Sequence, residues 1–159
     1  MLTERLQARC PSAKFAGVAY ICGYELRFSK RSIDGSGKAT IVESKGSSEK
    51  LYGALFEIDS NDLSALDKAE GKGYTRENSF CVFDVNNDQK IMTTTYISEK
   101  EEAGLLPYDW YKILIVAGAR KANLPTDYIS RLDQVESQAD PKENRSSRIE
   151  ALKALGEIK

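Results

Sequence analysis

The order of strand-like and helical segments is the feature that most limits what this chain can fold into. Short runs with strand composition occupy most of residues 15–98, and spacing typical of helices dominates from residue 108 onward. The expected strands cover residues 15–21, 24–29, 39–43, 51–56, 78–85 and 90–98. Turn-forming clusters, Asp34-Gly35-Ser36-Gly37 and Asn86-Asn87-Asp88, separate some of them.

One helix interrupts the strands, with Ser60 as its N-cap candidate and Gly71 as its C-terminal residue. Helices are also expected over residues 108–122 and 126–135, and an amphipathic tail helix is expected around Ile149, Leu152, Leu155 and Ile158. The pattern predicts an α+β domain whose short strands curl into a small mixed or antiparallel β-barrel with flanking helices. The tail helix suits docking on the domain or on a second copy, which leaves a homodimer open.

The charge balance excludes several classes of partner. With 23 basic and 24 acidic residues, the formal net charge is -1, so no global field marks a nucleic-acid or membrane partner. The chain has no histidine, which removes histidine-dependent triads and histidine metal sites. No signal-peptide region or long apolar run is present, which disfavours secretion and membrane spanning. Small neutral or zwitterionic ligands are the favoured partners.

The three cysteines, Cys10, Cys22 and Cys81, are odd in number and lack metal-ligand or C-x-x-C spacing. They are interpreted as reduced thiols of a cytoplasmic protein. Because Cys22 and Cys81 lie inside strand-like runs, both are expected to pack in the core.

Glu70 occupies an uncomfortable position for a carboxylate. It closes the apolar face of the helical segment Leu63-Ser64-Ala65-Leu66-Asp67-Lys68-Ala69, directly before Gly71. At about 100° per residue it lies angularly between Leu63 and Leu66, on the side that should face a core. Partial negative charge at a helix C-terminus also raises the proton affinity of an anion there. Glu70 is therefore a candidate general base, and the alternative is a helix-terminal glutamate whose side chain reaches water.

Several stretches together resemble the gamma-glutamylcyclotransferase-like superfamily, and within it the gamma-glutamylcyclotransferase branch. The resemblance spans Leu2 to about Leu132, and its matching segments are Leu2-Thr3-Glu4-Arg5, Pro11-Ser12-Ala13, Ala39-Thr40-Ile41, Leu51-Tyr52-Gly53-Ala54-Leu55-Phe56, Leu66-Asp67-Lys68-Ala69-Glu70-Gly71 with Tyr74, Tyr111-Lys112-Ile113, and Gly118-Ala119-Arg120-Lys121-Ala122-Asn123-Leu124-Pro125. It implies a compact mixed barrel with flanking helices. It also implies an intramolecular reaction, in which a γ-glutamyl amine attacks its own γ-amide carbonyl and gives 5-oxoproline and a free amino acid or amine.

The resemblance also implies roles for single residues. Glu70 matches the family's catalytic glutamate, which removes a proton from the attacking amine and returns one to the leaving amine. Tyr111 and Tyr74 match positions near the substrate, although an aromatic residue at a strand start also suits packing. Met1 and Leu2 are also expected to contact the substrate. No metal or organic cofactor is expected.

One departure from the family concerns its opening strand, which ends in a Tyr-Gly-Ser-Asn loop whose backbone amides hold the substrate. In this sequence only Met1 precedes Leu2-Thr3-Glu4-Arg5. Two explanations stay open: a misassigned start codon that hides a longer, active protein, or a genuinely short, non-catalytic relative. The sequence directly upstream of Met1 distinguishes them.

Alternative functions accompany the enzymatic one: a ligand-binding or interaction module that has lost its loop, and a structural or dimer-forming domain. The expected organisation is a truncated catalytic-type domain over 1–136, a linker over 137–145 and the tail helix over 146–159. Trp110 is interpreted as a packing anchor. Lys30, Arg31 and Arg145 are interpreted as solvated charges.

Overall fold

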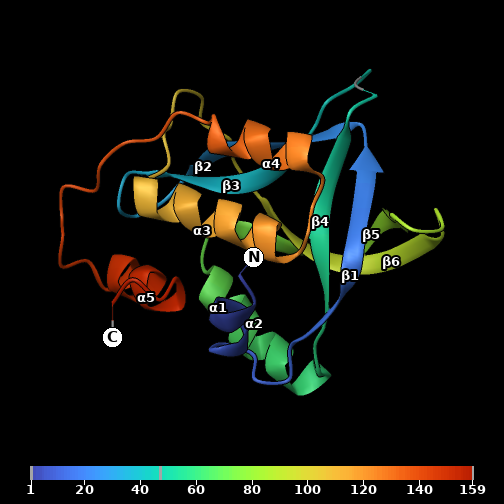
Figure 1. Ribbon diagram of the computed structural model, residues 1–159, viewed down its shortest axis with the longest axis horizontal. Helices are drawn as coiled ribbons and strands as arrows, with labels where there is room; N and C mark the ends of the chain where they lie inside the picture. The colour runs from blue at the N-terminus through green and yellow to red at the C-terminus, as the bar shows by residue number, and fades with distance from the viewer. Residues whose placement is uncertain (1, 47, 159) are drawn as a thin grey trace.

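The computed structural model describes residues 2–46 and 48–158, and Figure 1 shows how the elements are arranged. The helical elements are α1 (Thr3–Gln7), the 3-10 turn η1 (Ser60–Asp62), α2 (Leu63–Glu70), α3 (Asp109–Lys121), α4 (Thr126–Asp133) and α5 (Ser146–Ala154). The strands are β1 (Lys14–Cys22), β2 (Tyr24–Arg31), β3 (Gly37–Glu43), β4 (Lys50–Glu57), β5 (Tyr74–Asp84) and β6 (Lys90–Ser98). The α+β class with flanking helices is thereby confirmed.

The strands form two antiparallel sheets instead of one closed barrel. β4, β1, β5 and β6 lie side by side in that order, and β2 pairs with β3 in a separate sheet. The chain turns from one sheet to the other at Gly23, whose φ of 78° is a conformation that glycine adopts readily. Between β6 and β3 the link is a side-chain hydrogen bond, donated by the Ser98 N–H to Thr40 Oγ1. Within the described residues no backbone ladder joins these two strands, so the barrel stays open.

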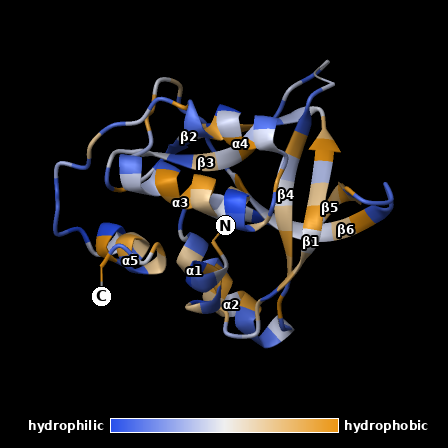
Figure 2. Cartoon of the chain, viewed as in Figure 1, coloured by the Kyte–Doolittle hydropathy of each residue, from blue (hydrophilic) through white to orange (hydrophobic). Residues whose placement is uncertain are grey.

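The largest buried cluster lies between the α3–α4 pair and the strands. Its buried members are Leu51, Val116, Ala119, Ala122, Leu124, Tyr128 and Leu132. Figure 1 shows α3 and α4 side by side, and Figure 2 shows hydrophobic colour on α3 and along β1. Burying a large apolar side chain stabilises a fold by about 1.5–3 kcal/mol. This cluster therefore fixes α3, and with it Tyr111, against the β-structure.

The helix that ends at Glu70 begins differently from the expectation. Ser60 is the first residue of η1, and the side chain of Asp59 accepts the capping hydrogen bond from the Asn61 N–H at 2.9 Å. The Ser60 N-cap prediction is wrong because an aspartate one residue earlier bonds the backbone two positions on. The helix ends before Gly71 as expected, and Gly71 has a positive φ of 75°, but its ψ of -170° lies outside the left-handed helical conformation that the sequence predicted.

The N-terminal and C-terminal helices meet in a second buried cluster. Its buried members are Leu2, Tyr108, Trp110, Leu114 and Ala151, and Ala151 is fully buried. The packing role of Trp110 is confirmed. α1 has no counterpart among the helices expected from the sequence. α5 ends at Ala154, earlier than the apolar spacing predicted, and leaves Ile158 41% exposed.

The three cysteines lie in different environments. Cys10 is fully buried, in a cluster with Leu6, Ala13 and Leu66. Cys81 is half-buried, and Cys22 is exposed. The expectation that Cys22 packs in the core is wrong because it is the last residue of β1, at the corner before Gly23.

Candidate active site around Glu70

Glu70 lies at the C-terminal end of α2 with its side chain only 18% exposed. Burial raises the pKa of Glu70, and the positive charges of Arg9, Arg5 and Lys30 offset this effect only in part. The nearest of these contacts joins Arg9 Nη1 to Glu70 Oε1 at 4.0 Å, which is too long for a hydrogen bond. Among the described residues, none donates a hydrogen bond to this carboxylate. Because buried carboxylates normally have such donors, Glu70 has acceptor capacity to spare.

Tyr74 and Tyr111 bind the two backbone polar groups of Ala39, a residue of β3. The Tyr74 hydroxyl donates to the Ala39 carbonyl at 2.7 Å, and the Tyr111 hydroxyl accepts from the Ala39 N–H at 3.2 Å. A bulge makes this residue available: the β2–β3 register passes from Arg27↔Thr40 to Lys30↔Lys38, which leaves Ala39 without a direct partner in β2. The two tyrosines thus replace ladder hydrogen bonds.

The hydroxyls of both tyrosines lie in the same electrostatic environment as Glu70. Burial raises the pKa of Tyr74, and the charges of Tyr111 and Glu70 raise it further. Burial likewise raises the pKa of Tyr111, with Glu70 adding to the effect. The structure therefore brings together three of the residues that the sequence selected, from α2, β5 and α3.

Basic side chains surround this group, and the sequence reasoning missed their placement. Arg5 and Arg9 are four positions apart at the N-terminal end, and Arg5 Nη1 is buried without a hydrogen-bond partner in the part of the chain described. Lys30 Nζ lies 4.8 Å from the centroid of the Tyr74 ring, so the interpretation of Lys30 as a fully solvated charge is wrong. The i, i+4 spacing of the two arginines was a usable signal, but it needed a helix that the sequence did not predict.

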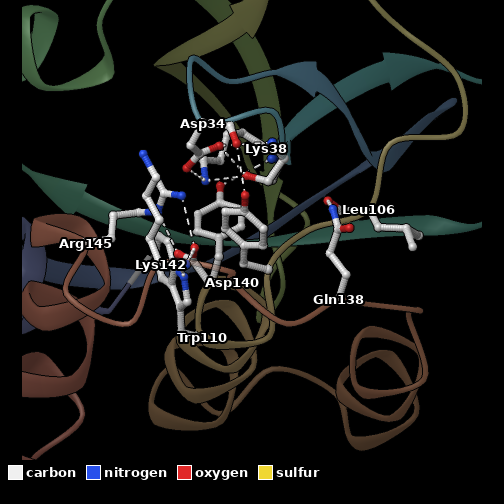
Figure 3. A network of polar contacts seen from close by, with 12 residues as sticks. Asp34, Lys38, Leu106, Trp110, Gln138, Asp140, Lys142 and Arg145 are labelled. Carbon is white, nitrogen blue, oxygen red and sulfur yellow. Dashed lines mark hydrogen bonds and ion pairs between the residues drawn. The ribbon is translucent and has the colours of Figure 1, made fainter.

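A second group of buried charges surrounds Lys38, which faces the Tyr111 ring, and Figure 3 shows its polar contacts. Lys38 Nζ donates to Asp34 Oδ2 at 3.1 Å and to Ser36 Oγ at 2.9 Å. It also faces three aromatic rings, with centroid distances of 5.6, 4.9 and 4.7 Å to Tyr108, Trp110 and Tyr111. Burial lowers the pKa of Lys38, and the nearby Asp34 carboxylate opposes this shift. We call these residues, with Asp140 and Arg145, the Lys38 network.

Asp140 and Arg145 connect the C-terminal segment to the Lys38 network (Figure 3). The Asp140 side chain is 1% exposed and accepts from Trp110 Nε1 at 2.9 Å and from Arg145 Nε at 2.6 Å. These contacts, led by the hydrogen bond from Arg145, lower the pKa of Asp140 to about 2. The interpretation of Arg145 as a solvated charge is wrong, because its side chain is only 17% exposed and lies over the Tyr108 ring.

The remaining predicted substrate contacts lie at the start of the chain. Met1 falls outside the described residues. The Leu2 side chain is 6% exposed and packs with Tyr108, Trp110 and Leu114, so any substrate contact of this residue would involve its backbone. The substrate role of Leu2 stays a prediction.

A surface cavity of about 330 Å³ adjoins Tyr74. Its other lining residues are Asp67, Arg76, Asn78 and Tyr96. Arg76 donates to both carboxylate oxygens of Asp67, and the Tyr96 hydroxyl donates to one of them at 2.7 Å. Glu70 follows Asp67 by three positions on α2, so the cavity lies one helical turn from the candidate base.

Comparison with known proteins places the chain in a family. A model described as the AIG2-like family matches residues 50–132, more than half of the chain, and this range contains Glu70, Tyr74 and Tyr111. The gamma-glutamylcyclotransferase of Bos taurus is 30% identical, over all of this chain and 86% of its own length. The chain belongs to the gamma-glutamylcyclotransferase-like superfamily.

Further relatives of this superfamily agree in sequence and in structure. The gamma-glutamylcyclotransferase of Homo sapiens is 29% identical over 86% of this chain and 74% of its own length. A solved structure of a gamma-glutamyl cyclotransferase has a TM-score of 0.83 and 26% identity, and the match covers 96% of this chain and 92% of that one. The recognition made from the sequence is therefore confirmed at the level of the superfamily.

Residues 2–46 and 48–158 contain neither a metal-binding cluster nor a membrane-spanning helix. No three His, Cys, Asp or Glu side chains gather there in a way that could hold a metal ion. None of the helices in this part of the chain combines the length and apolar character that crossing a membrane requires.

Proposed function

We propose that this protein is a γ-glutamyl cyclotransferase that converts a γ-glutamyl amino acid or amine into 5-oxoproline and the free amine. Glu70 acts as the general acid/base. The observation that carries the proposal is the state of this carboxylate, which is largely buried and lacks a hydrogen-bond donor among the described residues. A fold gains nothing from such a group, whereas a base that must receive a proton needs a free acceptor oxygen.

The reaction requires one proton to move between two nitrogen atoms. The α-amine of the substrate attacks the γ-carbonyl carbon, a new C–N bond closes the five-membered ring, and the γ-amide C–N bond breaks. Glu70 takes the proton from the attacking nitrogen and returns it to the leaving nitrogen. Because burial raises the pKa of Glu70, its carboxylate is a stronger base than an exposed glutamate. General acid–base help of this kind contributes about 10²- to 10⁴-fold in rate.

Tyr111 is positioned to donate a hydrogen bond during the reaction. Its hydroxyl oxygen accepts from the Ala39 N–H, and within the described residues its own proton has no acceptor. The Tyr74 proton, in contrast, is committed to the Ala39 carbonyl. Tyr111 therefore stabilises negative charge that develops on the substrate carbonyl oxygen, and Tyr74 keeps β3 in place.

The experiment measures 5-oxoproline released from γ-glutamyl dipeptides, γ-glutamyl amines and glutathione by the natural full-length protein. Wild type is expected to release it from at least one of these classes. Glu70→Gln keeps the shape of the side chain and is expected to reduce turnover by about 10²- to 10⁴-fold. Glu136→Gln, at an exposed glutamate far along the chain from the site, serves as the matched control and retains wild-type turnover.

The outcomes separate an enzyme from a binding module. Absence of 5-oxoproline with all three substrate classes, from a folded protein, contradicts the proposal. If the same protein binds a γ-glutamyl dipeptide without converting it, and Glu70→Gln binds equally well, the chain is a ligand-binding relative.

A further inference from the structure

The proposed reaction fixes where a substrate carboxylate must lie. In a γ-glutamyl compound the α-amine and the α-carboxylate are attached to the same carbon atom. A base that reaches the amine nitrogen therefore has the carboxylate oxygens within a few bond lengths. A residue that orients this carboxylate must be a cation close to Glu70.

The charge around Glu70 is suitable for an additional anion. Three cations, Arg5, Arg9 and Lys30, act on the single Glu70 carboxylate. Arg5 and Arg9 also repel each other, because each places a positive charge in the environment of the other. Glu150 on α5 attracts Arg5, but no ion pair within 4.0 Å joins Arg5 to any carboxylate in the described part of the chain. The site therefore carries more positive than negative charge.

Of the three cations that act on Glu70, Arg5 has a buried nitrogen with unused hydrogen-bonding capacity. Its Nη1 atom is buried and has no hydrogen-bond partner among the described residues. A buried guanidinium nitrogen without an acceptor is costly, and the cost is recovered when an anion binds. Arg9, in contrast, already faces Glu70 at 4.0 Å. Arg5 also lies close enough to Tyr111 and Glu70 for their charges to affect it.

The backbone around Arg5 is anchored by two buried leucines at the start of the chain. Leu2 and Leu6 lie on either side of Arg5 in the sequence and are 6% and 3% exposed, each in a different buried cluster. An anchored backbone reduces the freedom that Arg5 loses when it binds a ligand, and the planar guanidinium matches the geometry of a carboxylate.

We infer that Arg5 binds the α-carboxylate of the γ-glutamyl substrate, and so presents the neighbouring α-amine to Glu70. This inference rests on the proposed function and assigns a binding role to a residue that the sequence reasoning left without one. Arg9 keeps its place beside Glu70 and contributes to the positive field. The site accordingly selects compounds with a free α-carboxylate.

The test compares a γ-glutamyl dipeptide with the same compound carrying an α-carboxamide. Wild type is expected to prefer the carboxylate by about 10- to 100-fold in kcat/KM, the size expected for a charge-assisted hydrogen bond. Arg5→Gln loses this preference through a higher KM for the carboxylate substrate, and Arg5→Lys restores part of it. Arg120→Gln, at an exposed arginine paired with Asp133, keeps the full preference.

A binding measurement distinguishes failure of this inference from failure of the proposed function. If wild type turns over neither substrate, the proposed function fails, and calorimetry with 5-oxoproline and its carboxamide still tests Arg5. The inference is supported if wild type binds 5-oxoproline more tightly than its carboxamide and Arg5→Gln loses this difference. The inference is overturned if Arg5→Gln weakens binding of the carboxylate and of the carboxamide equally, because this indicates a structural role. It is also overturned if wild type does not distinguish the carboxylate from the carboxamide.

Discussion

Two groups of buried charges lie near Tyr111, one around Lys38 and one around Glu70, and they differ in how completely their members are paired. In the Lys38 network, the Lys38 ammonium has two hydrogen-bond acceptors and three aromatic faces. Around Glu70, the carboxylate has no donor among the described residues, and Arg5 Nη1 has no acceptor. Both groups are largely removed from water: Lys38 is 16% exposed and Glu70 is 18% exposed.

We interpret the fully paired group as structural and the incompletely paired group as the site of the proposed reaction. A fully paired network in a low-dielectric interior holds its parts in place, and removal of one member leaves another unpaired. A group with unpaired members lowers stability until a ligand completes it. The Lys38 network joins three segments of the chain, whereas the Glu70 group has positions that a substrate can fill.

The largest effect is expected for Glu70→Gln, which should lower activity and raise stability. Turnover falls by about 10²- to 10⁴-fold, while the free energy of unfolding at pH 7 rises. The sign follows from the raised pKa of Glu70: ionised Glu70 destabilises the fold above its folded-state pKa, and this cost disappears as the pH falls below 4.5, its ordinary value. Chemical denaturation of wild type and variant at pH 7 and pH 4 measures this difference in stability. A variant that is less stable than wild type at pH 7 contradicts the prediction.

Lys38→Met is expected to lower stability and to leave turnover largely unchanged. The variant leaves the Asp34 carboxylate, whose side chain is 11% exposed, without its cation, so the free energy of unfolding falls by about 2 kcal/mol. Lys38→Arg keeps the charge and loses less. A double variant with Asp34→Asn measures the coupling of the pair. If Lys38→Met instead reduced turnover as much as Glu70→Gln at unchanged stability, the comparison between the two groups would be reversed.

A pair of tyrosine variants tests the boundary between the groups. Tyr111→Phe removes the acceptor of the Ala39 N–H, and Tyr74→Phe removes the donor to the Ala39 carbonyl, so each lowers stability by about 1 kcal/mol. Tyr111→Phe is expected to lower kcat about tenfold more than Tyr74→Phe, since only its proton is free to reach the substrate. Equal kcat values for the two variants would assign both tyrosines to structure alone.

The last expected effect is confined to the acid range and comes from Asp140. Its pKa is lowered from 3.8 to about 2, so its contribution to stability is complete above pH 3.8 and is lost as the pH falls towards 2. Asp140→Asn is less stable at pH 7 and shows a shallower decline of unfolding free energy over this window. Denaturation curves at pH 7, 4, 3 and 2 give the dependence of unfolding free energy on pH for wild type and for Asp140→Asn. Equal slopes for the two proteins contradict the pairing of Asp140.

Local patterns in the sequence were sufficient to predict much of the fold. The alternation of strand residues predicted six strands close to their observed bounds. The helical position of Glu70 predicted its burial, because the angular spacing of Leu63 and Leu66 determines which face of α2 points inward. Gly71 was predicted correctly because the requirement for positive φ is local.

Features that depend on contacts between distant segments could not be predicted in this way. Arg145 is buried because a loop brings Asp140 against Trp110 on α3, and no local pattern encodes that meeting. Arg5 and Arg9 lie near Glu70 only because α1 packs beside α2 through Leu6 and Leu66. The open barrel also depends on strand pairing between distant segments, which alternation alone does not determine.

The bulge opposite Ala39 also provides a way to observe the site without substrate. The Ala39 amide proton is protected from exchange with solvent by the Tyr111 hydroxyl rather than by a neighbouring strand. Its exchange rate therefore reports how often the tyrosine leaves its place, independently of the unfolding of β3 as a whole. A single backbone amide, followed by hydrogen–deuterium exchange, thus measures how much of the time Tyr111 occupies its place beside β3.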